Sequence, residues 1–238
     1  MEKILGGIFI EGLSIYTHKT LIISDIHIGY EEALNMQGIL LPRMQFKDII
    51  DSLEKIFIEF GSKRIGKIII NGDLKHEFGR ISETEWRHTI RFLDYLGKKA
   101  KEIILIKGNH DIILGPIANK RGVKIKEYEI INDILIIHGD KIPEKKLLRR
   151  IKTIIIGHEH PAISLQEGPR IEKYKCFLKG KWEKFSLIVL PSFSPVAEGT
   201  NILKEDLLSP FLHQNLDDFR VFIVSDKVYD FGKLKNLR

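Results

Sequence analysis

Six short runs of isoleucine, leucine and valine constrain the fold of this chain more than any other feature. Each run is three or four residues long. Each is apolar at successive positions and therefore on both faces, which is typical of strands buried inside a layered sheet. The runs are too short to be buried helices. They occupy residues 21–23, 68–70, 103–106, 134–137, 154–156 and 187–190. We therefore expect an α/β fold built on these six strands.

Two segments between the runs have the 3.6-residue period of amphipathic helices. The first extends from Met44 to Phe60. The second begins at Ser82, which together with Glu85 forms a capping-box pattern, and it runs toward Lys99. We expect both helices to pack on a sheet.

The rest of the chain shows no internal repeat and no linker. With 238 residues, 43% of them hydrophobic, it is long and apolar enough for a proper core. We expect one domain over residues 1–238, with residues 200–238 completing or capping it. One cysteine excludes an intrachain disulfide framework and a zinc site made of several thiolates. No apolar run is long enough to span a membrane, so we expect a cytoplasmic protein.

Polar residues follow five of the six runs directly. They are Asp25 and His27, the segment 72–76, the segment 108–111, the segment 138–140, and the segment 157–160. In α/β sheets, ligands bind just beyond the carboxyl ends of the strands. Glycines at 72, 108, 139 and 157 would let the backbone turn tightly there. We therefore expect the five strand ends to converge on one site.

The candidate ligands carry nitrogen and oxygen donors and no thiolate. They are Asp25, His27, Asp73, Asn109, His138, His158 and His160. Seven such donors are too many for one tetrahedral zinc ion but suffice for two ions that share a carboxylate. Paired metals of this kind occur in phosphatases and nucleases. Imidazole with carboxylate suits Mn²⁺, Fe, Zn, Co or Ni better than magnesium. We expect two divalent transition-metal ions, with Mn²⁺ preferred.

In this order the five motifs resemble those of the calcineurin-like metallophosphoesterases. The resemblance implies a four-layer α/β/β/α sandwich, a two-metal site and hydrolysis of phosphate esters. It also implies how the ligands divide between the metals. One metal would be bound by Asp25, His27 and His160, the other by Asn109, His138 and His158, and Asp73 would bridge them.

A narrower resemblance is to small archaeal and bacterial phosphoesterases that include the DNA-ligase-associated type. It rests on the segments SDIHIGYEEAL, NGDLKHEFG, GHEHPA and LPSFSPVAEGTNILKEDLLSPFL. It implies a link to nucleic-acid metabolism and a helicase or ligase as partner.

One position separates this chain from the protein phosphatases of the superfamily. His76 stands three residues after Asp73, where many of them have an aspartate. A histidine there is similar to the double-strand-break repair nucleases. By that similarity His76 and His110 would contact the phosphate and assist the leaving group. Asp111 is a candidate to orient an imidazole, with a turn-stabilising role as the alternative.

Basic residues concentrate in one part of the chain. Residues 141–184 contain twelve Lys or Arg against five Glu. The candidate nucleic-acid contacts are Lys145, Lys146, Arg149, Arg150, Lys173 and Lys175, with Tyr174, Phe177 and Trp182 as nearby aromatics. Cations for phosphates and rings for bases are what a nucleic-acid groove uses. The alternative is a solvated basic face with the aromatic rings in the core.

Together these features favour a two-metal phosphodiesterase acting on nucleic acid. We expect a DNA nuclease of the 3′→5′ exonuclease type, linked to DNA repair. One alternative is a phosphodiesterase for cyclic or 2′,3′-cyclic nucleotides. Another is a non-catalytic binding scaffold, although scaffolds of this fold usually lose metal ligands and every ligand position is filled here. The apolar cluster at 207–212 is a candidate contact for a homo-oligomer, with core packing as the alternative.

Overall fold

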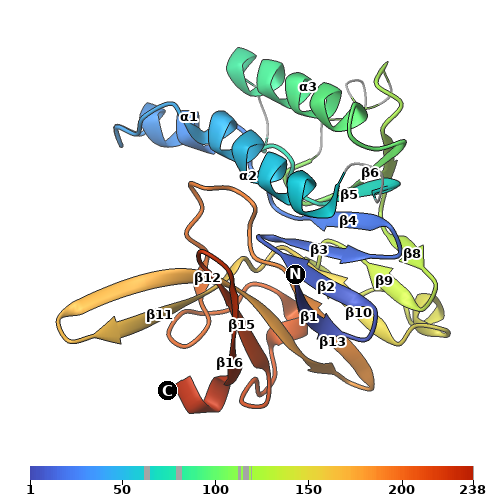
Figure 1. Cartoon of the computed structure of the whole chain (residues 1–238), viewed down its shortest axis with the longest axis vertical. Coiled ribbons are helices and arrows are strands. Elements are labelled where there is room, and N and C mark those ends of the chain that lie inside the picture. Colours follow the sequence, from blue (N-terminus) through green and yellow to red (C-terminus); the bar gives the residue numbers. More distant parts are fainter. Residues whose placement is uncertain (62–64, 79–81, 112–113, 115–117, 119, 238) are drawn as a thin grey trace.

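Two β-sheets lie face to face, and helices cover the outer face of the first sheet (Figure 1). A computed structural model of the chain describes residues 1–61, 65–78, 82–111, 114, 118 and 120–237. The six predicted strands are confirmed, and each falls within β4, β5, β6, β9, β10 or β13, or extends one residue beyond it. The predicted α/β class is therefore confirmed.

The first sheet has seven strands in chain order. They are β1 (Glu2–Leu5), β2 (Ile8–Glu11), β3 (Ser14–Thr17), β4 (Thr20–Ile23), β5 (Lys67–Asn71), β6 (Glu102–Ile106) and β7 (Lys124–Lys126). The strands β1 to β4 form an antiparallel meander, and β4 to β7 are parallel. The carboxyl ends of β4, β5 and β6 therefore share one edge of the sheet.

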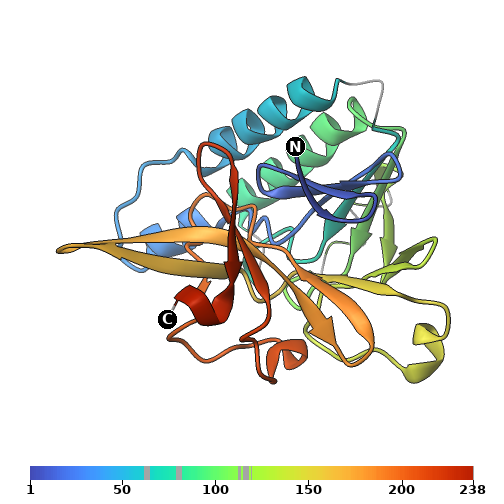
Figure 2. The ribbon, with the colours of Figure 1, turned by 60° about the horizontal axis from the view of Figure 1, so that its bottom comes forward.

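The second sheet has nine strands. They are β8 (Glu129–Ile131), β9 (Ile134–Ile136), β10 (Thr153–Ile156), β11 (Pro161–Glu167), β12 (Arg170–Trp182), β13 (Phe185–Val189), β14 (Thr200–Asn201), β15 (Arg220–Val224) and β16 (Val228–Lys233). Its order is β14-β11-β12-β13-β10-β9-β8, with β15 paired to β12 and β16 to β15. At its centre β9, β10 and β13 are parallel. The hairpin of β11 and β12 projects from the body of the molecule (Figure 2).

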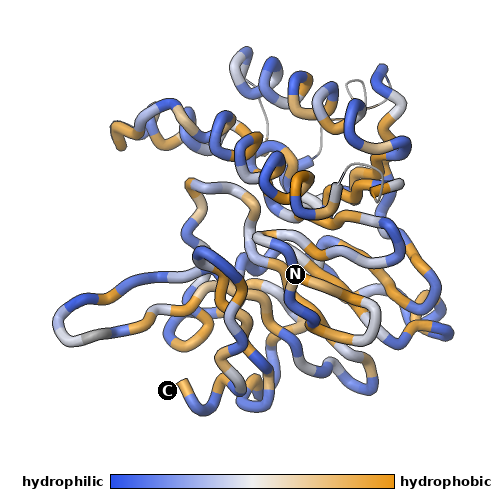
Figure 3. Tube along the Cα trace, in the orientation of Figure 1, coloured by the Kyte–Doolittle hydropathy of each residue, from blue (hydrophilic) through white to orange (hydrophobic). Residues whose placement is uncertain are grey.

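Three α-helices lie among the described residues, namely α1 (Tyr30–Met36), α2 (Gln45–Phe60) and α3 (Glu83–Gly97). Both predicted helices are confirmed. The apolar faces of α2 and α3, with Leu53, Phe57 and Phe92, pack on Ile68 and Ile70 of β5. Figure 3 shows hydrophobic and hydrophilic residues alternating along these helices, whereas the central strands are more uniformly hydrophobic.

The capping box predicted at the start of α3 is half formed. The Ser82 hydroxyl accepts a hydrogen bond from the Glu85 amide at 3.0 Å, as predicted. The carboxylate of Glu85 instead accepts the amide hydrogens of His76 and Glu77, at 2.8 and 3.0 Å. The predicted return bond is therefore wrong, because Glu85 fixes the segment that follows β5.

Apolar residues fill the space between the two sheets. Ile22, Ile69 and Ile104 of the first sheet share one buried cluster with Ile155 and Ile188 of the second. All five are 0% exposed. The apolar runs that form the central strands therefore also form the packed interface between the two sheets.

The outer face of the second sheet is covered differently. Three short 3-10 helices and irregular chain pack there: η2 (Lys145–Leu148), η3 (Pro210–Leu212) and η4 (Leu234–Leu237). The two sheets and the helices agree with the predicted sandwich, but the covering on this side is not α-helical in the described residues. Among the described residues, no helix combines the length and the apolarity needed to cross a bilayer.

Candidate metal centre

The predicted ligands converge where the carboxyl ends of strands from both sheets meet. Asp25 and His27 follow β4, Asp73 follows β5 and Asn109 follows β6. From the second sheet, His138 follows β9, and both His158 and His160 follow β10. All seven predicted ligands therefore come together at the junction of the two sheets, and not at the edge of a single sheet.

Asp25, His27 and His160 form what we call the first ligand group. One donor atom from each lies within 4.8 Å of the others. The Nε2 atoms of His27 and His160 are 3.3 Å apart. The Nε2 of His160 is also 3.3 Å from Oδ1 of Asp25. These three residues are those that the family resemblance assigns to one metal.

Asp73, His138 and His158 form the second ligand group, by the same distance criterion. The Nε2 of His138 is 3.4 Å from Oδ2 of Asp73 and 3.2 Å from Nδ1 of His158. Asn109 joins them, because its Oδ1 is 2.9 Å from the same His138 nitrogen. The set matches the predicted second metal site.

Asp73 faces both groups. Its Oδ2 is 4.0 Å from Nε2 of His27 in the first group and 3.4 Å from Nε2 of His138 in the second. Its Oδ1 accepts the amide hydrogen of His110 at 2.9 Å, which holds the carboxylate in place. The geometry agrees with the predicted bridging position.

The chemistry of the donors fits divalent metal ions. Asp25 is 0% exposed, and its Oδ1 has no hydrogen-bond partner among the described residues. A buried carboxylate is costly unless an opposite charge or a metal compensates it. Imidazole, carboxylate and amide donors without a thiolate are typical of sites for divalent transition metals. The residues present therefore fit a pair of such ions.

Two histidines of the centre have pKa values shifted in opposite directions. Burial, together with the neighbouring His160, lowers the pKa of His27 to about 3. Burial also acts to lower the pKa of His138, but its contact with Asp73 and the charge of Asp25 outweigh this and raise the pKa to about 9. The carboxylates are therefore concentrated around His138.

Backbone strain is concentrated at the ligands. In the described part of the chain, nine non-glycine residues have positive φ, and five of them are predicted ligands: Asp25 (54°), His27 (48°), Asp73 (46°), His158 (65°) and His160 (51°). Such conformations cost about 1–3 kcal/mol each and persist where the surrounding structure enforces them, typically at functional sites. These backbone conformations direct the five ligand side chains from the turns after β4, β5 and β10 into the metal centre.

Two glycines are required for different reasons. Gly72 has a φ of 83°, and a Cβ there would collide with the ring of His138. Gly108 lies against Asp73, so a Cβ there would collide with the carboxylate and the amide of that residue. Gly72 is therefore required both by the tight turn that we predicted and by the close approach of His138, whereas Gly108 is required by close approach alone.

Hydrogen bonds that the sequence analysis did not predict hold the first ligand group. The Ser192 hydroxyl, after β13, donates to the carbonyl of Asp25 at 2.6 Å. The Ser24 hydroxyl donates to Oδ2 of Asp25 at 2.6 Å. The side-chain amide of Gln45 in α2 donates to the carbonyl of His27 at 2.8 Å. Ser24 adjoins a predicted ligand, but no local pattern marks Ser192 or Gln45.

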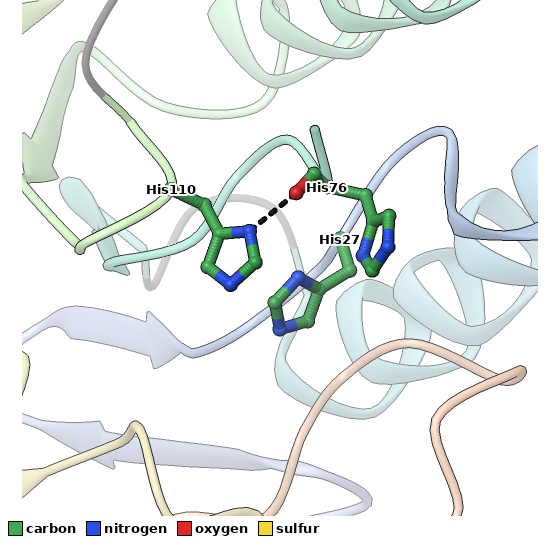
Figure 4. A group of neighbouring side chains, drawn as sticks. All are labelled: His27, His76 and His110. Atoms are coloured by element: carbon green, nitrogen blue, oxygen red, sulfur yellow. Dashed lines mark hydrogen bonds between the residues drawn. The ribbon is translucent and has the colours of Figure 1, made fainter. Parts of the chain in front are cut away.

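His76 and His110 lie beside the first ligand group. With His27 they form a third cluster whose ring nitrogens lie within 4.8 Å of one another (Figure 4). Nδ1 of His110 is hydrogen-bonded to the carbonyl of His76. The ring of His76 stacks on Tyr30 with centroids 4.1 Å apart. Both predicted catalytic histidines are thus placed where they can reach a phosphate at the centre.

Asp111 does not orient an imidazole. Its two carboxylate oxygens accept the amide hydrogens of Leu74 and Gly108, both at 3.0 Å. Burial, together with the nearby charge of Asp73, raises the pKa of Asp111 to about 7. The catalytic role that we considered for Asp111 is corrected to the alternative, in which it ties together the ends of β5 and β6.

The predicted basic contacts differ in position. Lys145, Lys146, Arg149 and Arg150 are exposed in and after η2. Lys173 is partly buried and pairs with Glu205 at 3.2 Å.

Lys175 does not face solvent in the way that we expected of a phosphate contact. Its ammonium donates to the backbone carbonyls of Ser192 and Ser194, and burial lowers its pKa to about 8. The charge of Lys175 therefore fixes the segment that supports Asp25.

The three aromatic residues agree with the alternative in which their rings pack in the core, and not with a stacking platform. Phe177 is 0% exposed and lies between the two sheets. Trp182 packs on Phe211, with ring centroids 4.9 Å apart. Tyr174 is partly buried against the core of the second sheet. Strand β12 directs Phe177 into the space between the sheets and the other two rings to the outer face of the second sheet, where they pack against its core.

Two cavities adjoin the ligand groups from different ends. The histidine cavity, about 560 Å³, is lined by His27 and His160 of the first group, by His76 and His110, and by Lys173. The tyrosine cavity, about 620 Å³, is lined by Asn109 and His138 of the second group, and by Tyr128 and Lys146. Each cavity is lined by residues of only one ligand group, so the two cavities reach the metal centre from the sides of different groups.

Three solved structures are similar to this one. The nuclease MPE of Pseudomonas putida has a TM-score of 0.66 at 17% identity, and the match covers 94% of each chain. Vps29 of Entamoeba histolytica has a TM-score of 0.36 at 16% identity, over 90% of this chain and 99% of that one. A predicted phosphoesterase of Streptococcus pneumoniae has a TM-score of 0.35 at 13% identity, over 90% and 97%.

No curated protein sequence matches the chain, and the comparisons give no support to the narrower resemblance to the DNA-ligase-associated type. Residues 18–185 match the calcineurin-like phosphoesterase family, and this span contains every predicted ligand and both predicted catalytic histidines. The chain therefore belongs to the calcineurin-like phosphoesterase family and is a metal-dependent phosphoesterase.

Proposed function

We propose that this protein is a two-metal phosphodiesterase that acts on nucleic acid, and that it is a DNA nuclease of the 3′→5′ exonuclease type with a role in DNA repair. The two cavities are the observation that carries this proposal. A phosphodiester has an organic group on each side of phosphorus, whereas a monoester has only one. A centre between two cavities accommodates both groups.

The ligand groups define how the centre would act. Asp25, His27 and His160 would hold one divalent ion, and Asn109, His138 and His158 the other, with Asp73 shared. When bound, such a pair supplies a nucleophile at neutral pH and neutralises charge on the phosphoryl oxygens. We propose Mn²⁺ as the native metal.

His110 would assist the departure of the leaving group. Its ring lines the histidine cavity beside the first ligand group, so an alkoxide leaving into that cavity comes within reach of the imidazole. A positioned general acid contributes roughly 10²–10⁴-fold in rate. His76 would contact the phosphate from the same side.

Two observations support a polymeric substrate. Each cavity has a lysine in its wall, Lys173 in one and Lys107 in the other, as a groove that follows a phosphate backbone requires. The nuclease from Pseudomonas putida has the same fold over nearly its full length.

End-labelled single- and double-stranded DNA incubated with Mn²⁺, beside bis-p-nitrophenyl phosphate and cyclic nucleotides, tests the proposal. We expect 5′-labelled DNA to shorten progressively from its 3′ end. Asp73→Asn, prepared identically, controls for contaminating nucleases. Hydrolysis of the small diesters alone would favour the cyclic-nucleotide alternative, and no hydrolysis with any transition metal would contradict the proposal.

A further inference from the structure

An aromatic ring that the proposed reaction does not use lies beside the second ligand group. Tyr128 stands in the turn between β7 and β8 and lines the tyrosine cavity. Its side chain is 43% exposed. Within the described part of the chain, its ring makes no ring–ring contact and its hydroxyl makes no hydrogen bond. Tyr128 therefore offers an open aromatic face that packing does not require.

The cavity around Tyr128 has the size and chemistry of a site for a small ligand. Its volume of about 620 Å³ lies within the usual range of roughly 300–1,000 Å³ for such sites. Ile142, which is 44% exposed, adds a second apolar surface to the wall. Asn109 and His138 lie at the end toward the metal centre. A ligand here would have an apolar face on the wall and a charged group at the metals.

The lysines of this cavity are not equivalent. Lys141 lies 3.5 Å from Asp140, and Lys146 lies 2.6 Å from Glu144. Lys107, which follows β6, is exposed and makes no ion pair with any described residue. Lys107, which is not paired with an acidic side chain of the described residues, therefore lines the same cavity as the ring of Tyr128.

We propose that the tyrosine cavity binds the nucleoside that keeps the scissile phosphate, with its base stacked on Tyr128 and Lys107 contacting the phosphate of the same nucleotide. This inference rests on the proposed function, which sends the leaving group into the histidine cavity and so leaves the tyrosine cavity to the other nucleoside. Stacking needs only the π-face that every base has, so the subsite accepts any base.

Calorimetric titration of the Mn²⁺-loaded protein tests the subsite without catalysis. The probes are 5′-dAMP, 3′-dAMP and inorganic phosphate. We expect the tighter-binding isomer to have a Kd about 5- to 150-fold below that of phosphate, the equivalent of ~1–3 kcal/mol for one stacked base. The ratio should fall to about one in Tyr128→Ala and persist in Tyr128→Phe, which keeps the aromatic face.

Two further variants separate stacking from other effects. Lys107→Ala should weaken the binding of dAMP and of inorganic phosphate by similar factors and so leave their ratio unchanged, because it removes a charge and not the ring. Tyr229→Ala, on the remote strand β16, should change nothing. A ratio near one in the wild type, or a ratio unchanged in Tyr128→Ala, would overturn the inference.

A substrate comparison distinguishes failure of the subsite from failure of the proposed function. With an adenine nucleotide at the cleaved end, Tyr128→Ala should lower kcat/KM by about 5- to 150-fold, and with an abasic nucleotide there by no more than about twofold. Equal losses on both substrates would refute only the subsite. A wild-type protein that cleaves neither DNA nor any small diester would refute the proposed function.

Discussion

The two sheets contribute different chemistry to the metal centre. The strand ends of the first sheet supply both carboxylates and the amide, together with His27. The strand ends of the second sheet supply only imidazoles, those of His138, His158 and His160. Each ligand group combines residues of both sheets, so neither sheet by itself forms a metal site.

The opposite pKa shifts of two histidines follow from this arrangement. His138 comes from the second sheet and faces Asp25 and Asp73 of the first, which raise its pKa to about 9. His27 comes from the first sheet and faces His160 of the second, and with burial this lowers its pKa to about 3. Charged or titratable groups of the opposite sheet thus contribute to the pKa shift of each of these histidines.

Removing the acid shared by both groups should have the largest effect. In Asp73→Asn we expect both metals to be lost and the rate to fall by roughly 10⁴-fold, because the stabilisation that paired metals supply is worth several kcal/mol. Metal analysis by mass spectrometry and kcat on a diester measure this. Asp51→Asn, on the exposed face of α2, is the control. If Asp73→Asn kept two metals per chain, Asp73 would not be a ligand shared by the two groups.

Removing one imidazole from either group should have a smaller effect. His27→Ala takes a ligand from the first group and His158→Ala from the second. We expect each variant to keep one metal per chain and to lose roughly 10³-fold in rate. Metal stoichiometry is the decisive measurement. Loss of both ions in either variant would show that the two groups act as one site.

His110→Gln should separate catalysis from metal binding. His110 lies beside the first ligand group but is not part of either predicted set. We expect full metal content and a fall in kcat of about 10²-fold, the lower end of the range for a general acid. Unimpaired turnover with both metals present would remove His110 from the mechanism.

Ser192→Ala should have the smallest effect and tests support from one sheet to the other. Its hydroxyl, after β13 of the second sheet, holds the carbonyl of Asp25, after β4 of the first. Losing a bond that positions a metal ligand typically weakens metal affinity about 10- to 100-fold, and we expect the lower figure. Ser225→Ala, on an exposed loop, is the control. Unchanged metal affinity would show that Asp25 needs no such support.

Local patterns predicted the six strands that carry the site, two of the three α-helices in the described residues, and a set of candidate ligands that the structure brings together. The apolar run at residues 21–23 predicts a buried strand without any knowledge of its neighbours in space. Asp25 and His27 follow this run directly in the sequence. Roles that depend on where a side chain points were predicted poorly. Glu85 fixes the segment after β5, Asp111 binds two amides, and Lys175 binds two carbonyls. In each case the charged side chain is hydrogen-bonded to backbone groups, and not to the partner that the sequence pattern predicted.

The sequence by itself determined which donors are available, because apolar runs end at polar residues whose chemistry does not change on folding. Only the tertiary structure decided how the donors are grouped, since each group joins strand ends from two sheets. Ser192 and Asp25 are 167 residues apart in the chain and yet share a hydrogen bond. A contact over that separation is fixed by the packing of the two sheets and leaves no local pattern.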